Sequence, residues 1–357
     1  MGIIIYNLIK SSCHNFFLYH LMKTTLKDIA EDTGYSVSTV SRALRGDASI
    51  HPESESKIID SARRLNYAHL PAKADTMPGD DIYFAVVTNF HDGEFYSSFF
   101  NGFTEASDSN DNGIHYGLHS FSSEQSIEKT LVGIQRLREF GYSGAVIFMP
   151  YLSRSDYQKL VNKIPLDFPL ISTSLVNQPV MDTIAFDGYS GGFSVAQHFH
   201  RRGYKTGGIL YGPQSKTEAL IRGNGFSDYC KQHTDFTHIW SFNGNYTPGS
   251  GRAAFSAFDK LRDKPKAVFA ANDEMAIGFM QSAISAGYDI PGDVAIAGYD
   301  DLRICRYIDP PLTSVTTDFN HLARHITSLL KDRLKKPVRH QGIQNLIPVQ
   351  LTIRQSS

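Results

Sequence analysis

The stretch that most constrains this chain is residues 25–45, TLKDIAEDTGYSVSTVSRALR, whose pattern predicts two short helices joined by a tight turn. Leu26 and Ile29 have the i, i+3 spacing that places side chains on one face of a helix. Gly34 stands where a helix ends in the left-handed conformation, and Ser36 supplies a side-chain oxygen for the first amides of the next helix. Two helices and a sharp turn are therefore expected within this stretch.

The second predicted helix divides into a packing face and an outward face. Val40 and Leu44 can pack onto the first helix, which leaves small, hydroxylated and basic side chains outside: Val37, Ser38, Ser41 and Arg42. Short side chains let a backbone approach a DNA groove, hydroxyls bond to phosphates or base edges, and arginine can bind a guanine with two hydrogen bonds. This pattern favours a helix-turn-helix in the major groove, although an ordinary surface hairpin of helices has the same spacing.

The residue identities resemble the DNA-binding headpiece of the lactose-repressor (LacI/GalR) family of bacterial regulators. The resemblance rests on the T-x-K-D-I-A opening and on S-x-S-T-V-S-R-x-L in the second helix. It implies a sequence-specific transcriptional regulator whose headpiece contacts operator DNA. On this basis the residues expected to contact DNA in the headpiece are Thr25, Ser36, Val37, Ser38, Thr39, Ser41, Arg42 and Arg45.

The segments around the headpiece set the expected domain boundaries. Residues 1–21 are interpreted as a disordered extension or a wrongly assigned start, since family members resemble the chain from Met22 onward. The headpiece is expected over 22–67, with a third helix opened by Pro52. Residues 68–80 are a hinge or linker. In the family this region wedges an apolar side chain into the minor groove, a role expected here for Leu70, but the sequence departs from the usual Y-x-P-N-x-x-A-R-x-L hinge pattern.

From residue 81 onward, apolar strands alternate with amphipathic helices. Continuous apolar strands between helices imply parallel sheets covered on both faces, and their number indicates two lobes. The expected lobes are residues 81–186 with 317–343, and residues 187–316 with 344–357. The strands are expected at 82–87, 145–149, 170–172, 183–186, 208–211, 267–271 and 294–297, and helices at 96–108, 127–140, 191–202 and 275–286. With the headpiece, the expected fold is a small all-α helix-turn-helix domain followed by a two-lobed α/β core that resembles periplasmic binding proteins.

Ligands of such sheets bind at the carboxyl ends of the strands. Several polar side chains follow predicted strands directly, among them Asn272, Asp273, Asp300 and Asp301. Carboxylate, amide and arginine groups with aromatic neighbours suit the hydroxyls and C–H faces of a sugar. Asn272 and Asp273 could instead be helix caps, and one of Asp300 and Asp301 a structural turn residue. The aromatic candidates could likewise belong to the core.

The family resemblance extends to the core through A-x-F-A-A-N-D-x-M-A-x-G, V-A-I-A-G-Y-D-D and P-P-L-T-S-V-T. It implies that Arg222, Asn272 and Asp300 contact the effector. Aromatic side chains at two matching positions would stack on it, with a further aromatic at the mouth of the first strand. The full set of expected effector-binding residues is Tyr96, Arg222, Tyr246, Asn272, Asp300 and Phe319.

Composition and the absence of other motifs exclude several classes of protein. The net charge of −1 means that DNA affinity must come from the placement of charges and from dimerisation. Three distant cysteines suit a reducing cytosol, and no apolar run reaches the ~18 residues that span a bilayer. The sequence has no H-E-x-x-H, P-loop or G-x-S-x-G motif. We therefore expect a cytoplasmic protein that is not an enzyme and has no metal, cofactor or membrane partner.

The combined expectation is a repressor of carbohydrate-utilisation genes. A homodimer would bind a pseudo-palindromic operator, and a sugar or sugar derivative between the lobes would lower operator affinity. A periplasmic sugar-binding protein would need a signal peptide and no headpiece. A sugar-processing enzyme would need two separated acids, whereas Asp300 and Asp301 are adjacent. A regulator of the same family that responds to a purine or another co-repressor remains the nearer alternative.

Overall fold

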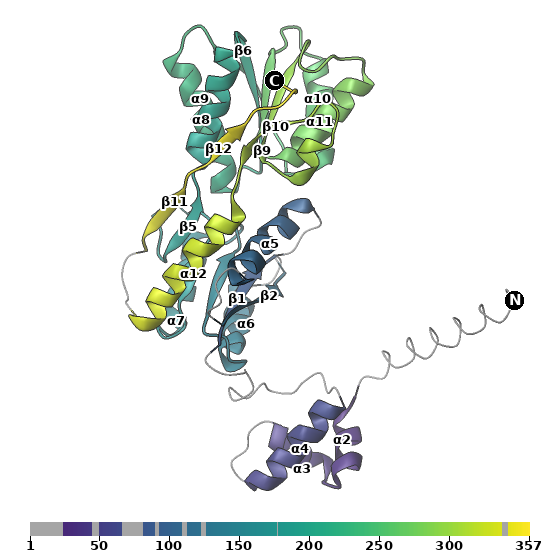
Figure 1. Cartoon of the computed structure of the whole chain (residues 1–357), viewed down its shortest axis with the longest axis vertical. Coiled ribbons are helices and arrows are strands. Elements are labelled where there is room, and N and C mark those ends of the chain that lie inside the picture. The colour runs from purple at the N-terminus through teal and green to yellow at the C-terminus, as the bar shows by residue number, and fades with distance from the viewer. Residues whose placement is uncertain are drawn as a thin grey trace, which may run out of the picture. The chain divides into compact units, whose positions relative to one another are not determined.

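The computed structural model describes residues 24–44, 50–65, 81–89, 93–108, 113–122, 126–176, 178–337 and 342–357. It contains two compact units, a headpiece within Met1–Met77 and a core that holds nearly all of the chain from Pro78 to Ser357. Figure 1 labels most of the elements of both units. The predicted extension 1–21, the hinge 68–80 with Leu70, and Arg45 lie outside the described residues. No helix among the described residues is long and apolar enough to cross a membrane.

The headpiece is three helices around a small apolar core, as the sequence predicts. They are α2 (Leu26–Thr33), α3 (Val37–Leu44) and α4 (Pro52–Arg64). Ile29, Val40 and Ile58 meet at the centre with no exposed surface, one from each helix. Burying one such side chain contributes roughly 1.5–3 kcal/mol, so this contact fixes how the three helices pack.

Helix caps hold the turn between α2 and α3. Thr25 and Asp28 form a reciprocal capping box at the start of α2. Gly34 ends that helix with φ of 75°, a left-handed conformation that glycine adopts without steric cost. Ser36 Oγ then accepts a hydrogen bond from Thr39 N at 3.1 Å, which confirms the predicted cap of α3.

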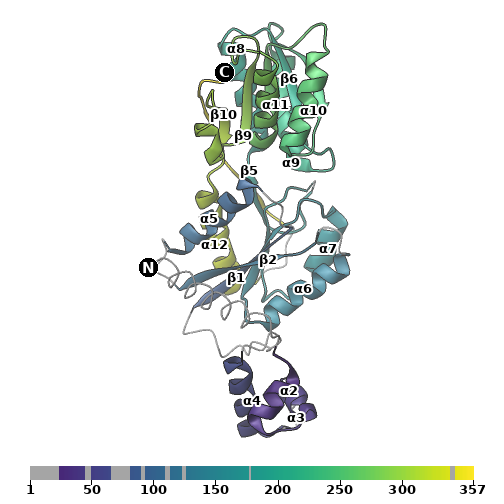
Figure 2. The same ribbon diagram turned by 90° about the vertical axis from the view of Figure 1, so that its right-hand side faces the viewer.

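The first lobe of the core is a six-stranded sheet with helices on both faces. Its strands are β1 (Ile82–Thr88), β2 (Ile114–Ser120), β3 (Gly144–Phe148), β4 (Leu170–Ser172), β5 (Thr183–Phe186) and β11 (Gln344–Ile347), in the order β11-β5-β4-β3-β1-β2. Its helices are α5 (Glu94–Asp108), α6 (Ile127–Glu139), α7 (Arg154–Lys163) and α12 (Phe319–Lys335). Figure 2 shows α5 and α12 on one side of this sheet and α6 and α7 on the other.

The second lobe repeats this arrangement. Its strands are β6 (Thr206–Tyr211), β7 (Thr237–Asn243), β8 (Ala267–Ala270), β9 (Ala295–Asp300), β10 (Thr313–Thr316) and β12 (Gln350–Thr352), in the order β12-β10-β9-β8-β6-β7. Helices α8 (Gly188–Arg201) and α9 (Thr217–Gln232) cover one face, and α10 (Pro248–Asp259) and α11 (Asp273–Ser285) cover the other. A short 3-10 helix, η2 (Arg303–Arg306), follows β9.

Alternating strand residues explain why both faces need helices. Phe84 and Val86 pack with α5 and α12, whereas Ala85 and Val87 pack with α6 and α7. Since successive side chains of a strand point to opposite faces, an apolar run buries both. The predicted parallel sheets are confirmed, and the recorded exception is the antiparallel pairing of β10 with β12.

The chain crosses between lobes after β5, after β10 and after β11. One predicted boundary is wrong: residues 344–347 were assigned to the second lobe, but β11 pairs with β5 in the first sheet. Asn345 and Leu346 at this edge are exposed, so the strand lacks the continuous apolar pattern that marks the central strands. The return to the second lobe comes between Ile347 and Gln350.

Candidate functional site

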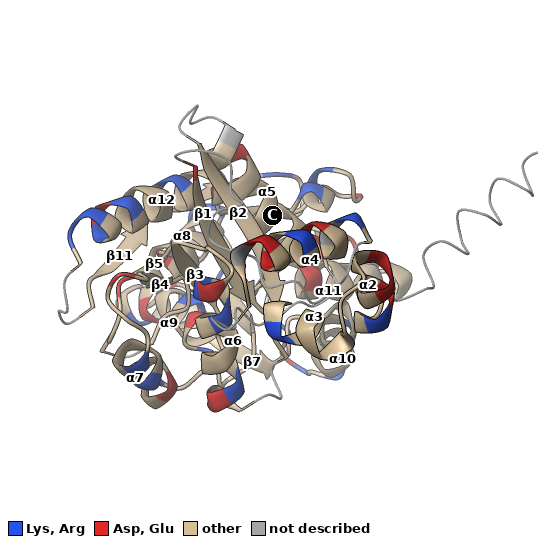
Figure 3. Cartoon of the chain, turned by 90° about the horizontal axis from the view of Figure 1, so that it is seen from below, with Lys and Arg blue, Asp and Glu red and all other residues tan. Residues whose placement is uncertain are grey.

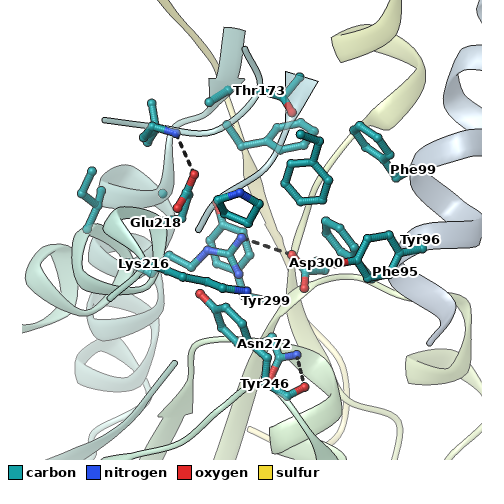
Figure 4. Close-up of a pocket in the computed structure, with 18 of the residues that line it drawn as sticks. Phe95, Tyr96, Phe99, Thr173, Lys216, Glu218, Tyr246, Asn272, Tyr299 and Asp300 are labelled. Atoms are coloured by element: carbon teal, nitrogen blue, oxygen red, sulfur yellow. Dashed lines mark hydrogen bonds and ion pairs between the residues drawn. The ribbon is translucent and has the colours of Figure 1, made fainter. Parts of the chain in front are cut away.

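A cavity of about 350 Å³ lies between the two lobes, at the carboxyl ends of their strands. This is where doubly wound parallel sheets bind ligands. All six predicted effector residues, which lie far apart in the sequence, contribute to its lining: Tyr96, Arg222, Tyr246, Asn272, Asp300 and Phe319. Figure 4 shows side chains from both lobes pointing into this space.

The first lobe contributes an aromatic wall. Phe319 opens α12, and its ring meets those of Phe95 and Phe186 edge-on, with centroids 5.4 and 5.5 Å apart. Phe148, at the end of β3, packs against Tyr96 with centroids 6.1 Å apart. These rings offer an apolar surface and a few ring edges to a ligand, with no charged group among them.

The second lobe contributes the charged wall, centred on Arg222 of α9. Its Nη1 donates to the carbonyl oxygen of Ala271 at 2.6 Å, and its Nη2 lies 3.4 Å from Asp300 Oδ1. The guanidinium carbon stands 3.7 Å from the centroid of the Tyr299 ring. Burial opposes the charge, but Asp300 and, to a smaller extent, Glu218 raise the pKa of Arg222, which therefore stays charged.

Close packing of α8 against α9 fixes the position of this arginine. A Cβ at Gly192 would lie 1.8 Å from the carbonyl oxygen of Arg222, so no larger residue fits there without moving backbone. The glycines around residue 190 predict a strand-to-helix turn, and Gly188 and Gly191 do open α8. At Gly192, however, the missing side chain lets the two helices touch.

Four buried polar atoms that line the cavity or its wall have no hydrogen-bond partner among the described residues. They are Thr173 Oγ1, Tyr246 Oη, Tyr299 Oη and Asp300 Oδ1. Burial raises the pKa of both phenols, so these hydroxyls stay protonated and can donate. A buried polar group left unpaired costs about 1–3 kcal/mol, which a ligand with matching groups would recover.

Asp300 and Asp301, adjacent in sequence, take different places. Asp300 faces the cavity and Arg222, whereas Asp301 Oδ1 pairs with Arg354 at 2.6 Å and its Oδ2 accepts a hydrogen bond from Thr316 at 3.0 Å. Both residues have positive φ, 111° and 52°, which turns the chain sharply after β9. Asp301 is thus the structural turn residue, and Asp300 is the member of the pair available to a ligand.

Asn272 and Asp273 also divide between structural roles. Asn272 caps α11 by accepting from Met275 N at 3.1 Å, and its Nδ2 donates to Tyr246 O at 3.1 Å. Asp273 is fully buried and binds Leu302 N and Ser314 Oγ. The helix-cap interpretation is therefore correct for Asn272, whose second amide hydrogen and second Oδ1 lone pair remain for a ligand.

The exposed face of α3 is the candidate nucleic-acid surface. Val37 is 45% exposed, and Ser38 and Arg42 are exposed beside it, while Val40 and Leu44 are buried. Figure 3 shows acidic and basic segments on α2 and α4 but no acidic segment on α3. This helix therefore presents small side chains and one cation with no nearby acid of its own.

Thr25 and Ser36 have local roles in addition to any contact with DNA. Thr25 belongs to the capping box of α2, and Ser36 Oγ lies 2.8 Å from both Ser38 Oγ and Thr39 Oγ1. Both residues are exposed, while Thr39 and Ser41 are half-buried. The predicted contact residues that the structure describes are thus all on α3, its preceding turn or the start of α2.

Two family profiles match separate parts of the chain. Residues 25–69 match "Bacterial regulatory proteins, lacI family", and residues 196–357 match "Periplasmic binding protein-like domain". The chain belongs to the LacI family. Regulators of the LacI family are transcriptional repressors rather than enzymes; they bind operator DNA and small-molecule effectors, and they form dimers.

Relatives of this LacI-family chain match it over most of its length. The HTH-type transcriptional repressor PurR of Mannheimia succiniciproducens is 24% identical over 93% of this chain and 98% of its own length. The probable HTH-type transcriptional repressor ExuR of Bacillus subtilis is 26% identical over 82% of this chain and 86% of its own.

Solved structures share the fold. A lac repressor dimer bound to operator and the anti-inducer ONPF has a TM-score of 0.69 at 22% identity, covering 94% of this chain and 99% of that one. A complex of the transcriptional regulator CelR with cellobiose has a TM-score of 0.67 at 22% identity, covering 94% and 100%. The predicted headpiece and two-lobed core are thereby confirmed.

Several residues that line the cavity were not predicted from the sequence. Lys216 and Glu218 stand at the start of α9, and Glu274 directly follows Asn272 and Asp273. Glu218 precedes Arg222 by four residues on one helix, a spacing that places both on the same face and could have identified it. No comparable signal marked Lys216, which lies before the helix begins. The described residues contain no group of three or more His, Cys, Asp or Glu placed to hold a metal ion.

Proposed function

We propose that this LacI-family repressor controls carbohydrate-utilisation genes and that a sugar or sugar derivative in the inter-lobe cavity sets its operator affinity. The observation that carries the proposal is a set of buried polar atoms without a hydrogen-bond partner among the described residues: Thr173 Oγ1 of the first lobe, and Tyr246 Oη, Tyr299 Oη and Asp300 Oδ1 of the second lobe, across from the aromatic wall. A polyol both donates and accepts hydrogen bonds at several points and presents C–H faces to aromatic rings. Its chemistry matches both walls.

The contacts between the lobes support allosteric control. Glu218 Oε1 of the second lobe accepts a hydrogen bond from Leu175 N of the first at 2.7 Å. Glu94 Oε2 of the first accepts one from Ile304 N of the second at 3.2 Å. A ligand that touches both lobes and prefers one lobe arrangement shifts the population towards it. The predicted hinge would carry that shift to the operator-binding headpieces of a dimer.

A purine co-repressor is the second candidate. The aromatic wall formed by Phe95, Phe148 and Phe319 favours it, because planar bases also pack against aromatic rings. PurR repressors are among the relatives, so the family alone does not decide between the two. The buried hydroxyl and carboxylate oxygens that lack a hydrogen-bond partner in the described part of the chain favour a polyol.

A ligand screen separates the two candidates. The full chain is melted in the presence of neutral sugars, sugar acids, sugar phosphates and purine bases, since a ligand of the folded state raises its melting temperature. The active compounds are then added to a titration of a pseudo-palindromic operator. The sugar proposal requires that a sugar both stabilises the protein and changes operator affinity. If only purines stabilise the protein, the effector is a purine co-repressor and not a sugar.

A further inference from the structure

Lys216 is a cation in the cavity wall on which the charge of Glu218 acts, but not from within ion-pair distance. It is the residue that precedes α9, and its side chain extends into the cavity beside Tyr246 (Figure 4). Its Nζ lies 5.2 Å from the centroid of the Tyr246 ring, and no described carboxylate forms an ion pair with it. Burial lowers the pKa of this ammonium, a sign that water does not fully solvate it.

The other charges of the same wall are already engaged. Arg222 forms an ion pair with Asp300 and donates a hydrogen bond to the carbonyl oxygen of Ala271. Glu218 accepts a hydrogen bond from the backbone N–H of Leu175. Lys216 is therefore the one cation that lines the described cavity without a carboxylate within ion-pair distance. A half-buried ammonium whose neighbours are an aromatic ring and a carboxylate beyond ion-pair distance can still form a charge-assisted hydrogen bond with an anion.

One further feature adds positive charge to this part of the cavity. The N-terminus of α9, a helix of 16 residues, has no side-chain cap at Lys216 and contributes a partial positive charge, which Glu218 in its first turn partly offsets. The remaining lining carboxylate is Glu274, and burial together with the charge of nearby Glu94 raises its pKa. Of the lining carboxylates, Glu218 is the one whose charge acts on Lys216, and it already accepts the hydrogen bond from Leu175 N.

We propose that the effector is a polyol bearing an anionic group, a carboxylate or a phosphate, and that Lys216 binds that group. The polyol part would fill the hydroxyl positions at Tyr246, Tyr299 and Asp300, and the anion would reach the start of α9. This inference rests on the proposed sugar-controlled function and narrows the class of effector. An ion pair with Lys216 would let the protein bind an anionic sugar more tightly than the neutral parent sugar. Hydroxyl groups alone would not discriminate between the two.

The test uses matched series of compounds on the full chain. Glucose is compared with glucuronate and glucose 6-phosphate, and galactose with galacturonate and galactose 6-phosphate, by melting temperature and calorimetric titration. We expect an anionic member of at least one series to bind about tenfold or more tightly than its neutral parent. The arm that responds, carboxylate or phosphate, identifies the anionic group.

Substitutions assign the effect to the lysine. Lys216→Met keeps the apolar stem and should weaken binding of the anionic member about tenfold or more, while leaving the neutral parent within about twofold. Lys216→Arg, which retains the charge, should restore most of the affinity. Lys231→Met is the matched control, because Lys231 is exposed at the other end of α9 and pairs with Asp228 at 2.8 Å.

The outcomes separate this inference from the proposed function. If a neutral sugar binds as tightly as its anionic partner, or if Lys216→Met weakens both equally, the anion-binding role is wrong while sugar control stands. If no member of either sugar series binds and a purine does, both proposals fail together. Selective loss of the anionic member in Lys216→Met, with Lys231→Met unchanged, supports the inference.

Discussion

The guanidinium of Arg222 is stacked on the ring of Tyr299, with its central carbon 3.7 Å from the ring centroid. Asp300, the next residue of β9, lies 3.4 Å from Arg222 Nη2. That separation exceeds the 2.7–2.9 Å typical of a charge-assisted hydrogen bond. One strand end thus supplies both a stacking surface and a loosely held counter-charge, which leaves Asp300 Oδ1 and Arg222 able to turn to a ligand.

Replacing Asp300 by asparagine tests this arrangement. Asp300→Asn keeps the size of the side chain but removes the charge and one acceptor, so effector affinity should fall about tenfold or more. Operator affinity without effector should stay within about threefold, because the headpiece is unchanged. Calorimetry with the effector and a gel-shift titration with operator measure the two effects.

Asp263→Asn is the matched control for this substitution, since Asp263 is an exposed carboxylate of the same lobe outside the cavity lining. An induction curve unaltered by Asp300→Asn would show that this carboxylate does not contact the effector.

Arg42→Ala should weaken operator binding without affecting the core. Arg42 is the single charged side chain of α3, and a bidentate contact with a base contributes about 1–3 kcal/mol. Affinity for the operator should therefore fall by about tenfold to a hundredfold, with unchanged effector binding. Gel-shift titration at fixed salt measures it.

Lys57→Ala serves for comparison, because Lys57 is an exposed cation of α4 in the same headpiece. The variant removes an equal charge away from α3 and should lower affinity much less. Equal losses from the two variants would mean that α3 is not the base-reading helix.

The sequence predicted elements best where a strand or helix is buried. The central strands β1, β3 and β8 are continuous apolar runs and were found within one or two residues of their ends. The edge strands β2 and β7 alternate between exposed and half-buried positions along most of their length and were missed. An edge strand pairs with another strand on one side only, and more of its side chains are exposed. Its sequence therefore lacks the continuous apolar run of a central strand.

The candidate site shows the same limit. Arg222, Asp300 and Phe319 were found because motifs place them at strand ends or at a crossing between lobes. Lys216 was missed because no local pattern of residues marks it, and Glu218 was missed although its spacing from Arg222 could have identified it; its bond to Leu175 of the other lobe is visible only in the structure. The resemblance to the LacI family supplied roles that spacing alone left open.

Gly102→Ala tests how closely α5 must approach α12. A Cβ at Gly102 would lie 2.6 Å from the backbone carbonyl atoms of Phe319, which cannot move without displacing that ring from the cavity. We expect a loss of about 1–3 kcal/mol in the free energy of unfolding of the core and weaker effector binding. Urea unfolding and calorimetry measure both.

Gly249→Ala is the control glycine, because its added Cβ would meet nothing closer than 3.6 Å in the first turn of α10. It should be neutral or slightly stabilising. If Gly102→Ala behaves in the same way, the tight contact between α5 and α12 does not position Phe319.

The buried carboxyl of Asp273 should make the stability of the core depend on pH. Burial, and then the charge of Asp300, raise its pKa from 3.8 to about 8. An acid whose pKa is raised on folding binds more protons in the native state, so its contribution to stability is present at low pH and is lost as pH rises from 3.8 towards 8.

Asp273→Asn does not titrate and keeps acceptor and donor groups for Leu302 and Ser314. The free energy of unfolding of the variant, minus that of the parent, should therefore increase with pH across this window, by at most about 1.4 kcal/mol per pH unit. Urea unfolding at several pH values measures this difference, and a difference that stays constant with pH would show that Asp273 does not carry the raised pKa.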